Sequence, residues 1–211
     1  MITINRNGLK SVSRFMANKD VRYYLNGVLI ESSPLETRLV ATDGHAMGIY
    51  RQDAETDNDG THVIIMPLET VKLILSWKKA SKHQSDMLTL TVGEKECRVE
   101  FNGNAAVFVP VDATYPNYRN VVPESISGDV AQYQLCYLQA CEDSAQDIAQ
   151  SKFNTSRTTI GYNGNGAAIV DCGTPNLFAI VMPIRTSEID TSSFQWARQS
   201  LPQPESRSEE R

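Results

Sequence analysis

The chain has 211 residues, 41% of them hydrophobic and 21% charged, so it can bury a core and form one or two domains. Its 20 Lys and Arg against 25 Asp and Glu give a formal net charge of -5, which argues against holding nucleic acid mainly by excess positive charge. The longest nearly uncharged apolar stretch, 63–68, is far below the roughly 20 residues of a membrane span, and 1–5 lack a signal-peptide core. We therefore expect a cytoplasmic protein with no membrane partner.

The cysteine and histidine content indicates neither a zinc framework nor a disulfide scaffold. No C-x-x-C pair occurs, and only three histidines accompany the four cysteines. We expect buried thiols at Cys97, Cys136, Cys141 and Cys172, and no metal or other cofactor.

One order of predicted elements, a strand, an amphipathic helix and then further strands, occurs three times along the chain. The first copy has a helix over 7–19 among strands 2–5, 21–32, 38–43 and 46–52. The second has a helix over 68–82 among strands 62–66, 87–93, 97–102 and 105–111. The third has a helix over 134–150 among strands 129–133, 158–162, 167–171 and 178–184. This order predicts an α+β fold, with an ordered Pro- and Tyr-containing connector over 112–124. The polar composition after Arg185 predicts a flexible tail over 186–211.

Two of the three predicted helices are basic on the face opposite their apolar stripe. The first carries Lys10, Arg14 and Lys19 with no acid between them, and the second carries Lys72, Lys78, Lys79 and Lys82 beside Glu69. The third is acidic, with Glu142, Asp143 and Asp147. The basic side chains either solvate surface helices or line a cavity suited to a phosphate backbone, unevenly because of the third helix.

An enzymatic interpretation would pair Asp43 with His45, two residues along one strand, and add His62 or His83 as an acid-base or metal group. No nucleophile elbow, H-E-x-x-H motif, Walker loop or G-x-G-x-x-G motif supports it, and 161–166 (GYNGNG) is typical of a hairpin turn. We therefore predict no catalytic residue and no metal site.

Three segments carry a family resemblance: 20–31 (DVRYYLNGVLIE) with 39–45 (LVATDGH), 115–123 (YPNYRNVVP) and 181–185 (VMPIR). They resemble the middle domain of the bacterial DNA polymerase III beta subunit, the sliding clamp, its F-P-D-Y-R-x-V-x-P segment and its C-terminal V-M-P-M-R. The resemblance implies a DNA clamp (processivity) fold, in which helices line a ring and sheets lie outside. It also implies a non-catalytic processivity factor that encircles double-stranded DNA and tethers a DNA polymerase.

The chain is shorter than that family pattern, as would suit a phage or plasmid replicon. Members of the bacterial family have six repeats in three domains, whereas three βαβββ repeats are predicted in this chain. We interpret 1–122 as a complete domain and 123–185 as a half-domain completed by another subunit. If a ring needs twelve repeats, four chains close it as a homo-oligomer, a tetramer. The alternative is a clamp-derived decoy or adaptor that binds polymerase or loader peptides without closing on DNA.

The resemblance also assigns residues to two surfaces. Near DNA it places the tyrosine pair Tyr23 and Tyr24, preceded by Arg22, beside the basic helix residues; one tyrosine of the pair should point away, as in an alternating strand. A pocket for short linear motifs of the polymerase and the clamp loader would be formed by Leu25, Thr42, Gly44, His45, Met47, Pro123, Ile180, Met182, Pro183, Ile184 and Arg185. Ala46 stands where the family usually has Arg, which removes a charge and an aliphatic stem from the wall. The segment 199–202 (QSLP) loosely imitates such a motif and could occupy the pocket in cis.

Overall fold

The computed structural model describes residues 1–54, 60–78, 85–150, 158–185, 192 and 197. Lys79, Lys82 and His83 lie outside these residues, as do the segment 199–202 and almost all of the predicted tail. Within the described part of the chain, no helix is long and apolar enough to cross a membrane.

The elements follow one another as strand, helix and three strands, twice, and then helix and three strands. The first unit comprises β1 (Ile2–Asn5), α1 (Arg6–Ser13), β2 (Gly27–Ser32), β3 (Glu36–Thr42) and β4 (Ala46–Asp53). The second comprises β5 (His62–Pro67), α2 (Leu68–Ser76), β6 (Met87–Val92), β7 (Cys97–Phe101) and β8 (Asn104–Phe108). The third comprises α3 (Leu135–Ala149), β9 (Thr159–Gly161), β10 (Ala168–Thr174) and β11 (Leu177–Val181). Two 3-10 helices, η1 (Tyr23–Leu25) and η2 (Tyr118–Val121), precede β2 and follow β8. The predicted α+β class is confirmed.

The first two units exchange their leading strands. One sheet has the order β1-β6-β7-β8, and the other has the order β5-β2-β3-β4-β11-β10-β9, with every neighbouring pair antiparallel. β1 therefore lies in the sheet of the second unit and β5 in that of the first. The third unit continues the first unit's sheet through β4 and β11, where Met47 lies opposite Ile180. A single seven-stranded sheet thus includes strands from both sides of residue 122.

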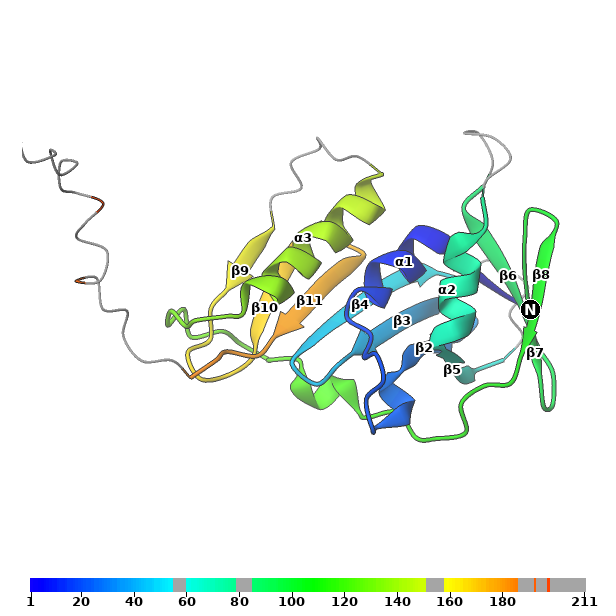
Figure 1. Ribbon diagram of the computed structural model, residues 1–211, viewed down its shortest axis with the longest axis horizontal. Helices are drawn as coiled ribbons and strands as arrows, with labels where there is room; N and C mark the ends of the chain where they lie inside the picture. The colour runs from blue at the N-terminus through cyan, green and yellow to red at the C-terminus, as the bar shows by residue number, and fades with distance from the viewer. Residues whose placement is uncertain (55–59, 79–84, 151–157, 186–191, 193–196, 198–211) are drawn as a thin grey trace, which may run out of the picture.

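The three helices lie in a row across one face of the sheets, with α1 between α2 and α3 (Figure 1). Leu9 and Val12 of α1 are fully buried in the core beneath the row. Gly8 lets α1 approach β4 closely, because a Cβ at this position would collide with the ring of Tyr50. On the opposite face of the seven-stranded sheet, a second core packs Met47 and Ile180 against the connector that leads to η2.

Four predicted elements differ from the structure by more than three residues. α2 ends at Ser76, where Trp77 takes an extended backbone conformation, although the helix was predicted over 68–82. α1 ends at Ser13 instead of continuing to Lys19, and the chain leaves it through turns with i to i-3 hydrogen bonds that bury Phe15. The predicted strand 21–32 begins only at Gly27, after η1. The predicted strand 129–133 is reduced to one bridge, between Gln132 and Ile184. The first two leading strands pair in each other's sheets, whereas the described residues place no companion unit beside the third.

Three of the four thiols are buried as expected, but Cys136 is exposed. Cys136 lies in the first turn of α3, before the buried residues of that helix, which begin at Cys141. Burial raises the pKa of Cys141 and of Cys172 to about 12, so both thiols stay protonated at neutral pH.

Candidate functional site

A hollow of about 290 Å³ opens on the face of the seven-stranded sheet opposite the helices. Seven of the eleven predicted pocket residues line it: Leu25, Thr42, Gly44, His45, Met47, Ile180 and Met182. The other lining residues are Arg22, Tyr24, Ala46, Tyr115, Pro116, Tyr118 and Val121. The hollow therefore combines side chains from the first unit, the connector and the end of the third unit.

The pairing of β4 with β11 forms the floor of the hollow. Met47 and Ile180 lie opposite each other in this pair, and both are almost fully buried. Just beyond β11, the backbone N–H of Met182 donates to the carbonyl of His45 at 2.8 Å, and the Met182 side chain is 39% exposed. The hollow thus has a rigid apolar floor and an adaptable thioether at its rim, which suits it to an apolar side chain.

The connector over 112–124 forms a wall of the hollow beside the floor of β4 and β11. Tyr115 and Tyr118 are buried there, and Pro116 and Val121 line the hollow beside them. Burial raises the pKa of the Tyr115 phenol well above its ordinary value, so that ring stays neutral. Pro123, which follows η2, is not among the residues that line this hollow, whereas Pro116 is. Both prolines belong to the motif at 115–123, and the motif alone did not show which one faces the hollow.

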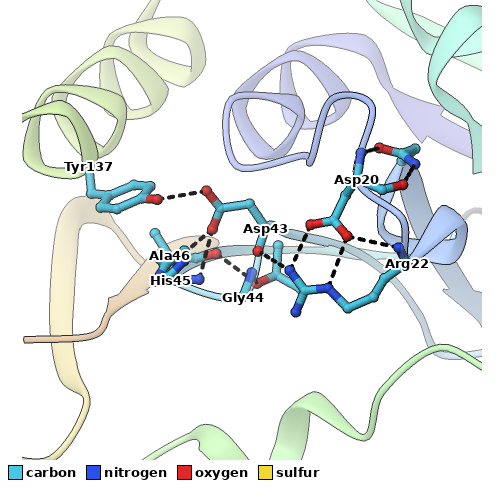
Figure 2. Close-up of polar contacts among 9 residues, drawn as sticks. Asp20, Arg22, Asp43, Gly44, His45, Ala46 and Tyr137 are labelled. Carbon is cyan, nitrogen blue, oxygen red and sulfur yellow. Dashed lines mark hydrogen bonds and ion pairs between the residues drawn. The ribbon is translucent and has the colours of Figure 1, made fainter.

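The tight turn between β3 and β4, drawn in Figure 2, lines a third side of the hollow through Thr42, Gly44 and His45. The Asp43 carboxylate accepts hydrogen bonds from the backbone N–H of His45 at 2.8 Å and of Ala46 at 3.0 Å. It also accepts one at 2.9 Å from the hydroxyl of Tyr137, which comes from α3. Gly44 has a φ of +95°, a backbone conformation that residues other than glycine adopt only with strain. The turn is therefore held from its own backbone and from the third unit.

Arg22 braces the same turn from the other side (Figure 2). Its guanidinium donates to the Asp43 carbonyl at 2.9 Å and makes two bonds, of 3.0 and 2.7 Å, to the Asp20 carboxylate. These contacts lower the pKa of Asp20 from 3.8 to about 2. The sequence resemblance grouped Arg22 with DNA-facing residues, but here it lines the hollow. It therefore supplies a cation close to Ala46, where the family's usual arginine is absent.

The tyrosine pair is split between two environments. Tyr24 lines the hollow, while Tyr23 is exposed and does not. The rings meet edge to face with centroids 5.9 Å apart. They occupy η1 and not a strand, so strand alternation is not the reason for their different directions.

Pro183, Ile184 and Arg185 do not line the hollow. They border a different depression, formed with 127–132 and 163–165. The backbone explains this, because Ile184 donates from its N–H to the carbonyl of Gln132 at 2.8 Å and so turns away from β4. Their assignment to a peptide pocket stays a prediction, and in this structure they are separate from the hollow formed by the other seven.

The basic residues of α1 are paired with acids of α3. Lys10 contacts Asp147 at 2.7 Å, and Arg14 contacts Asp147 at 2.6 Å and Asp143 at 3.0 Å. The hydrogen bond to Asp147 is the main reason that the pKa of Arg14 is raised. Ser144 joins the same helices by donating to the carbonyl of Ser11 at 2.8 Å. Counting charge helix by helix therefore overstated the positive charge that α1 presents.

The other basic residues of the predicted helices that the structure describes are accessible. Lys19 and Lys78 are exposed, and Lys72 makes only an exposed contact of 3.4 Å with Glu69 of its own helix. Contacts of this kind contribute little to stability, about 0 to 1 kcal/mol.

The described residues of the enzymatic alternative, Asp43, His45 and His62, make other contacts in the structure. Asp43 is engaged in capping its own turn, and His45 stacks at a centroid distance of 6.1 Å on Tyr137. His62 lies at the start of β5, opposite Ser32. Among the described residues, no three His, Cys, Asp or Glu side chains are grouped so that they could hold a metal ion.

Two solved structures share this fold. The DNA polymerase III beta subunit of Thermotoga maritima aligns over 89% of this chain and 66% of its own, with a TM-score of 0.66 and 16% identity. The sliding clamp of Pseudomonas aeruginosa bound to griselimycin aligns over 87% of this chain and 65% of its own, with a TM-score of 0.57 and 21% identity. The fold is therefore that of bacterial DNA polymerase sliding clamps.

Sequence similarity leads to the same family. The pattern of the DNA polymerase III beta subunit central domain matches residues 5–117, more than half of the chain. The beta sliding clamp of Vibrio cholerae is 31% identical over 158 residues, which are 74% of this chain and 42% of that protein. The chain belongs to the DNA polymerase III beta subunit family, as its motifs predicted. It spans less than half the length of the Vibrio cholerae protein.

Proposed function

We propose that this protein is a sliding clamp subunit that encircles duplex DNA and tethers a DNA polymerase as a processivity factor, without catalysing a reaction. Family membership and the clamp fold support the clamp role. The hollow carries the tethering part of the proposal, because it is a preformed apolar concavity with a buried Met47–Ile180 floor and polar groups at its edge. A short leucine-containing segment of a polymerase or clamp loader is the occupant that this chemistry suits.

The helix row supports the DNA part of the proposal. Lys72, Lys78 and Lys19 are accessible for phosphate contacts, while Lys10 and Arg14 would first have to leave their acidic partners. A closed ring needs little net attraction, so a lining of modest positive charge is compatible with retention on DNA.

We further propose that the chain assembles as a tetrameric ring, with 1–122 as a complete domain and 123–185 as a half-domain. The third unit supports this, because the segment before α3 makes one bridge where a leading strand would pair, and β9 is an edge strand. Another subunit could complete both. Light scattering across a concentration series should give four times the 23.4 kDa of one chain. A monomer or dimer throughout would reject the four-chain ring.

Peptide binding tests the tethering proposal. The probe is a fluorescein-labelled peptide centred on Gln-Ser-Leu-Leu, and fluorescence anisotropy measures its affinity. Met182→Asp places a charge at the apolar rim and should weaken binding at least tenfold while leaving the oligomeric mass unchanged, since desolvating a carboxylate costs more than about 1.4 kcal/mol. Leu35→Asp is the control, because Leu35 is an exposed apolar residue outside the hollow. Equal affinity for wild type and Met182→Asp would remove the hollow from the proposal.

A second candidate is the decoy, which binds such peptides but does not close on DNA. The pairing of Lys10 and Arg14 with Asp147 favours it, since this pairing reduces the charge that DNA would meet. Retention on a nicked circular plasmid and loss after linearisation would identify a ring. Peptide binding without retention, with and without a clamp loader, would identify a decoy.

A further inference from the structure

A second, larger hollow of about 520 Å³ lies beside the first on the same face of the seven-stranded sheet. Three arginines, Arg38, Arg51 and Arg119, line it. Its other lining residues are Ile49, Tyr118, Val122, Pro175, Asn176 and Phe178. Guanidinium groups thus surround a largely apolar floor, and the lining contains no carboxylate.

The strands β4 and β11 place the two hollows next to each other. On β4, Met47 lines the first hollow and Ile49, two residues further along the same face, lines the second. On β11, Ile180 lines the first hollow and Phe178, two residues earlier on the same face, lines the second. Residues two apart on a strand are separated by about 7 Å, the length of two extended peptide residues. Tyr118 borders both hollows. An extended segment anchored in the first hollow therefore reaches the second within a few residues.

The arginines are paired with carboxylates that lie outside the lining. Arg119 contacts Glu31 at 2.6 Å and Arg38 contacts Glu36, whereas Arg51 reaches Glu36 only at 3.8 Å. The side chains of Arg51 and Arg119 are about half exposed, so an incoming carboxylate can share these guanidinium groups at little cost. Arg119 also rests over the ring of Tyr118, with its guanidinium carbon 4.6 Å from the centroid, which preorganises it.

We propose that the second hollow is a subsite for acidic residues that flank the hydrophobic anchor of a bound peptide. The proposal rests on the proposed function of the first hollow. A planar guanidinium fork binds a carboxylate through two parallel hydrogen bonds, and three such forks around one apolar floor select an acidic residue next to an apolar one. The subsite therefore contributes specificity among partners that carry the same anchor.

The test compares labelled peptides on the full-length chain at 50 mM NaCl. All contain the Gln-Ser-Leu-Leu anchor; two carry a pair of glutamates, before or after the anchor, and two carry glutamines at the same positions. One of the two acidic peptides should bind roughly two- to fivefold more tightly per carboxylate than its glutamine counterpart. This gain should shrink at 500 mM NaCl, because salt screens exposed charges.

Arg51→Gln and Arg51→Glu should abolish the gain and leave the affinity of the glutamine peptides unchanged. Arg98→Glu is the matched control, since Arg98 is as exposed as Arg51, at 52% against 54%, but lies on β7 in the other sheet. The subsite is refuted if the glutamine peptides bind while neither acidic peptide gains affinity. It is also refuted if Arg98→Glu removes the gain as fully as Arg51→Glu does. Failure of every peptide to bind would instead reject the first hollow, and the subsite with it.

Discussion

Replacing Asp147 by asparagine should lower the stability of the fold and increase its affinity for DNA. Asp147 lies at the contact between α1 and α3, with a side chain only 6% exposed. Its two oxygens accept from Lys10 at 2.7 Å and from Arg14 at 2.6 Å. Asparagine keeps the size of the side chain but removes its charge, so Lys10 loses its counterion and Arg14 keeps only Asp143, at 3.0 Å.

The size of the stability change follows from how far water can replace that counterion. A hydrogen bond to a charged group contributes about 1.5–3 kcal/mol, and removing one partner of a fully buried pair costs about 3–5 kcal/mol. The side chains of Lys10 and Arg14 are 47% and 32% exposed, so solvent screens much of the loss. We therefore expect the free energy of unfolding to fall by about 1–3 kcal/mol, mostly through Arg14.

Urea denaturation followed by circular dichroism measures this change. Glu69→Gln is the control, because Glu69 is 83% exposed and contacts Lys72 at 3.4 Å. It should change the free energy of unfolding by less than about 0.5 kcal/mol. An equal effect of the two substitutions would refute the assignment of Asp147 as a structural ion-pair partner.

The same variant reports on the direction that α1 faces. If α1 lines the DNA channel, Asp147→Asn frees Lys10 for a phosphate and leaves Arg14 with Asp143 alone, and the slope of log affinity against log salt should steepen by about 1, or by up to about 2 if Arg14 also reaches a phosphate. Duplex binding at four salt concentrations gives this slope. Lower stability with an unchanged slope would mean that Lys10 and Arg14 do not reach DNA.

Three further changes follow from the structure. Gly44→Ala should cost about 1–2 kcal/mol in urea denaturation, because φ is +95° there and a Cβ would lie 2.8 Å from the Arg22 guanidinium; an unchanged midpoint would contradict the turn geometry. The ion pair that lowers the pKa of Asp20 to about 2 is fully present above its ordinary value of 3.8 and is lost as the pH falls towards 2; Asp20→Asn should therefore flatten the loss of stability over that interval. A disulfide reagent at pH 8 should modify Cys136 rapidly and the other three thiols only after denaturation; fast reaction of Cys141, whose pKa is raised to about 12, would contradict its burial.

Local patterns predicted most of the fold. The strand β7 alternates buried and exposed residues from Cys97 to Phe101, and its period of two identifies it in the sequence. β1 was predicted with its observed bounds for a related reason, since Ile2 and Ile4 both face the core. These strands could be predicted because the alternation of apolar and polar side chains along the sequence indicates which face of the strand is buried.

The errors concern features that depend on partners distant in the sequence. The segment 129–133 has strand-like composition, but a strand needs a neighbour, and Val130 is 79% exposed where none is described. The acids of α3 lie 129 and 133 residues from Arg14, so their pairing was invisible to a charge count along one helix. Pro116 and Pro123 share one motif and lie before and after η2, and of the two only Pro116 lines the hollow.

The third helix links the two surfaces that the proposed function needs. At its N-terminal end Tyr137 donates to Asp43 at 2.9 Å and so holds the turn that walls the peptide hollow. Burial and the negative charge of Asp43 raise the pKa of Tyr137 to about 12, which keeps it a donor at neutral pH. Near its C-terminal end the same helix binds Lys10 and Arg14 through Asp147. Under the proposed function, a shift of α3 that released these cations would also move a wall of the hollow, so we expect the two surfaces to be coupled through this helix.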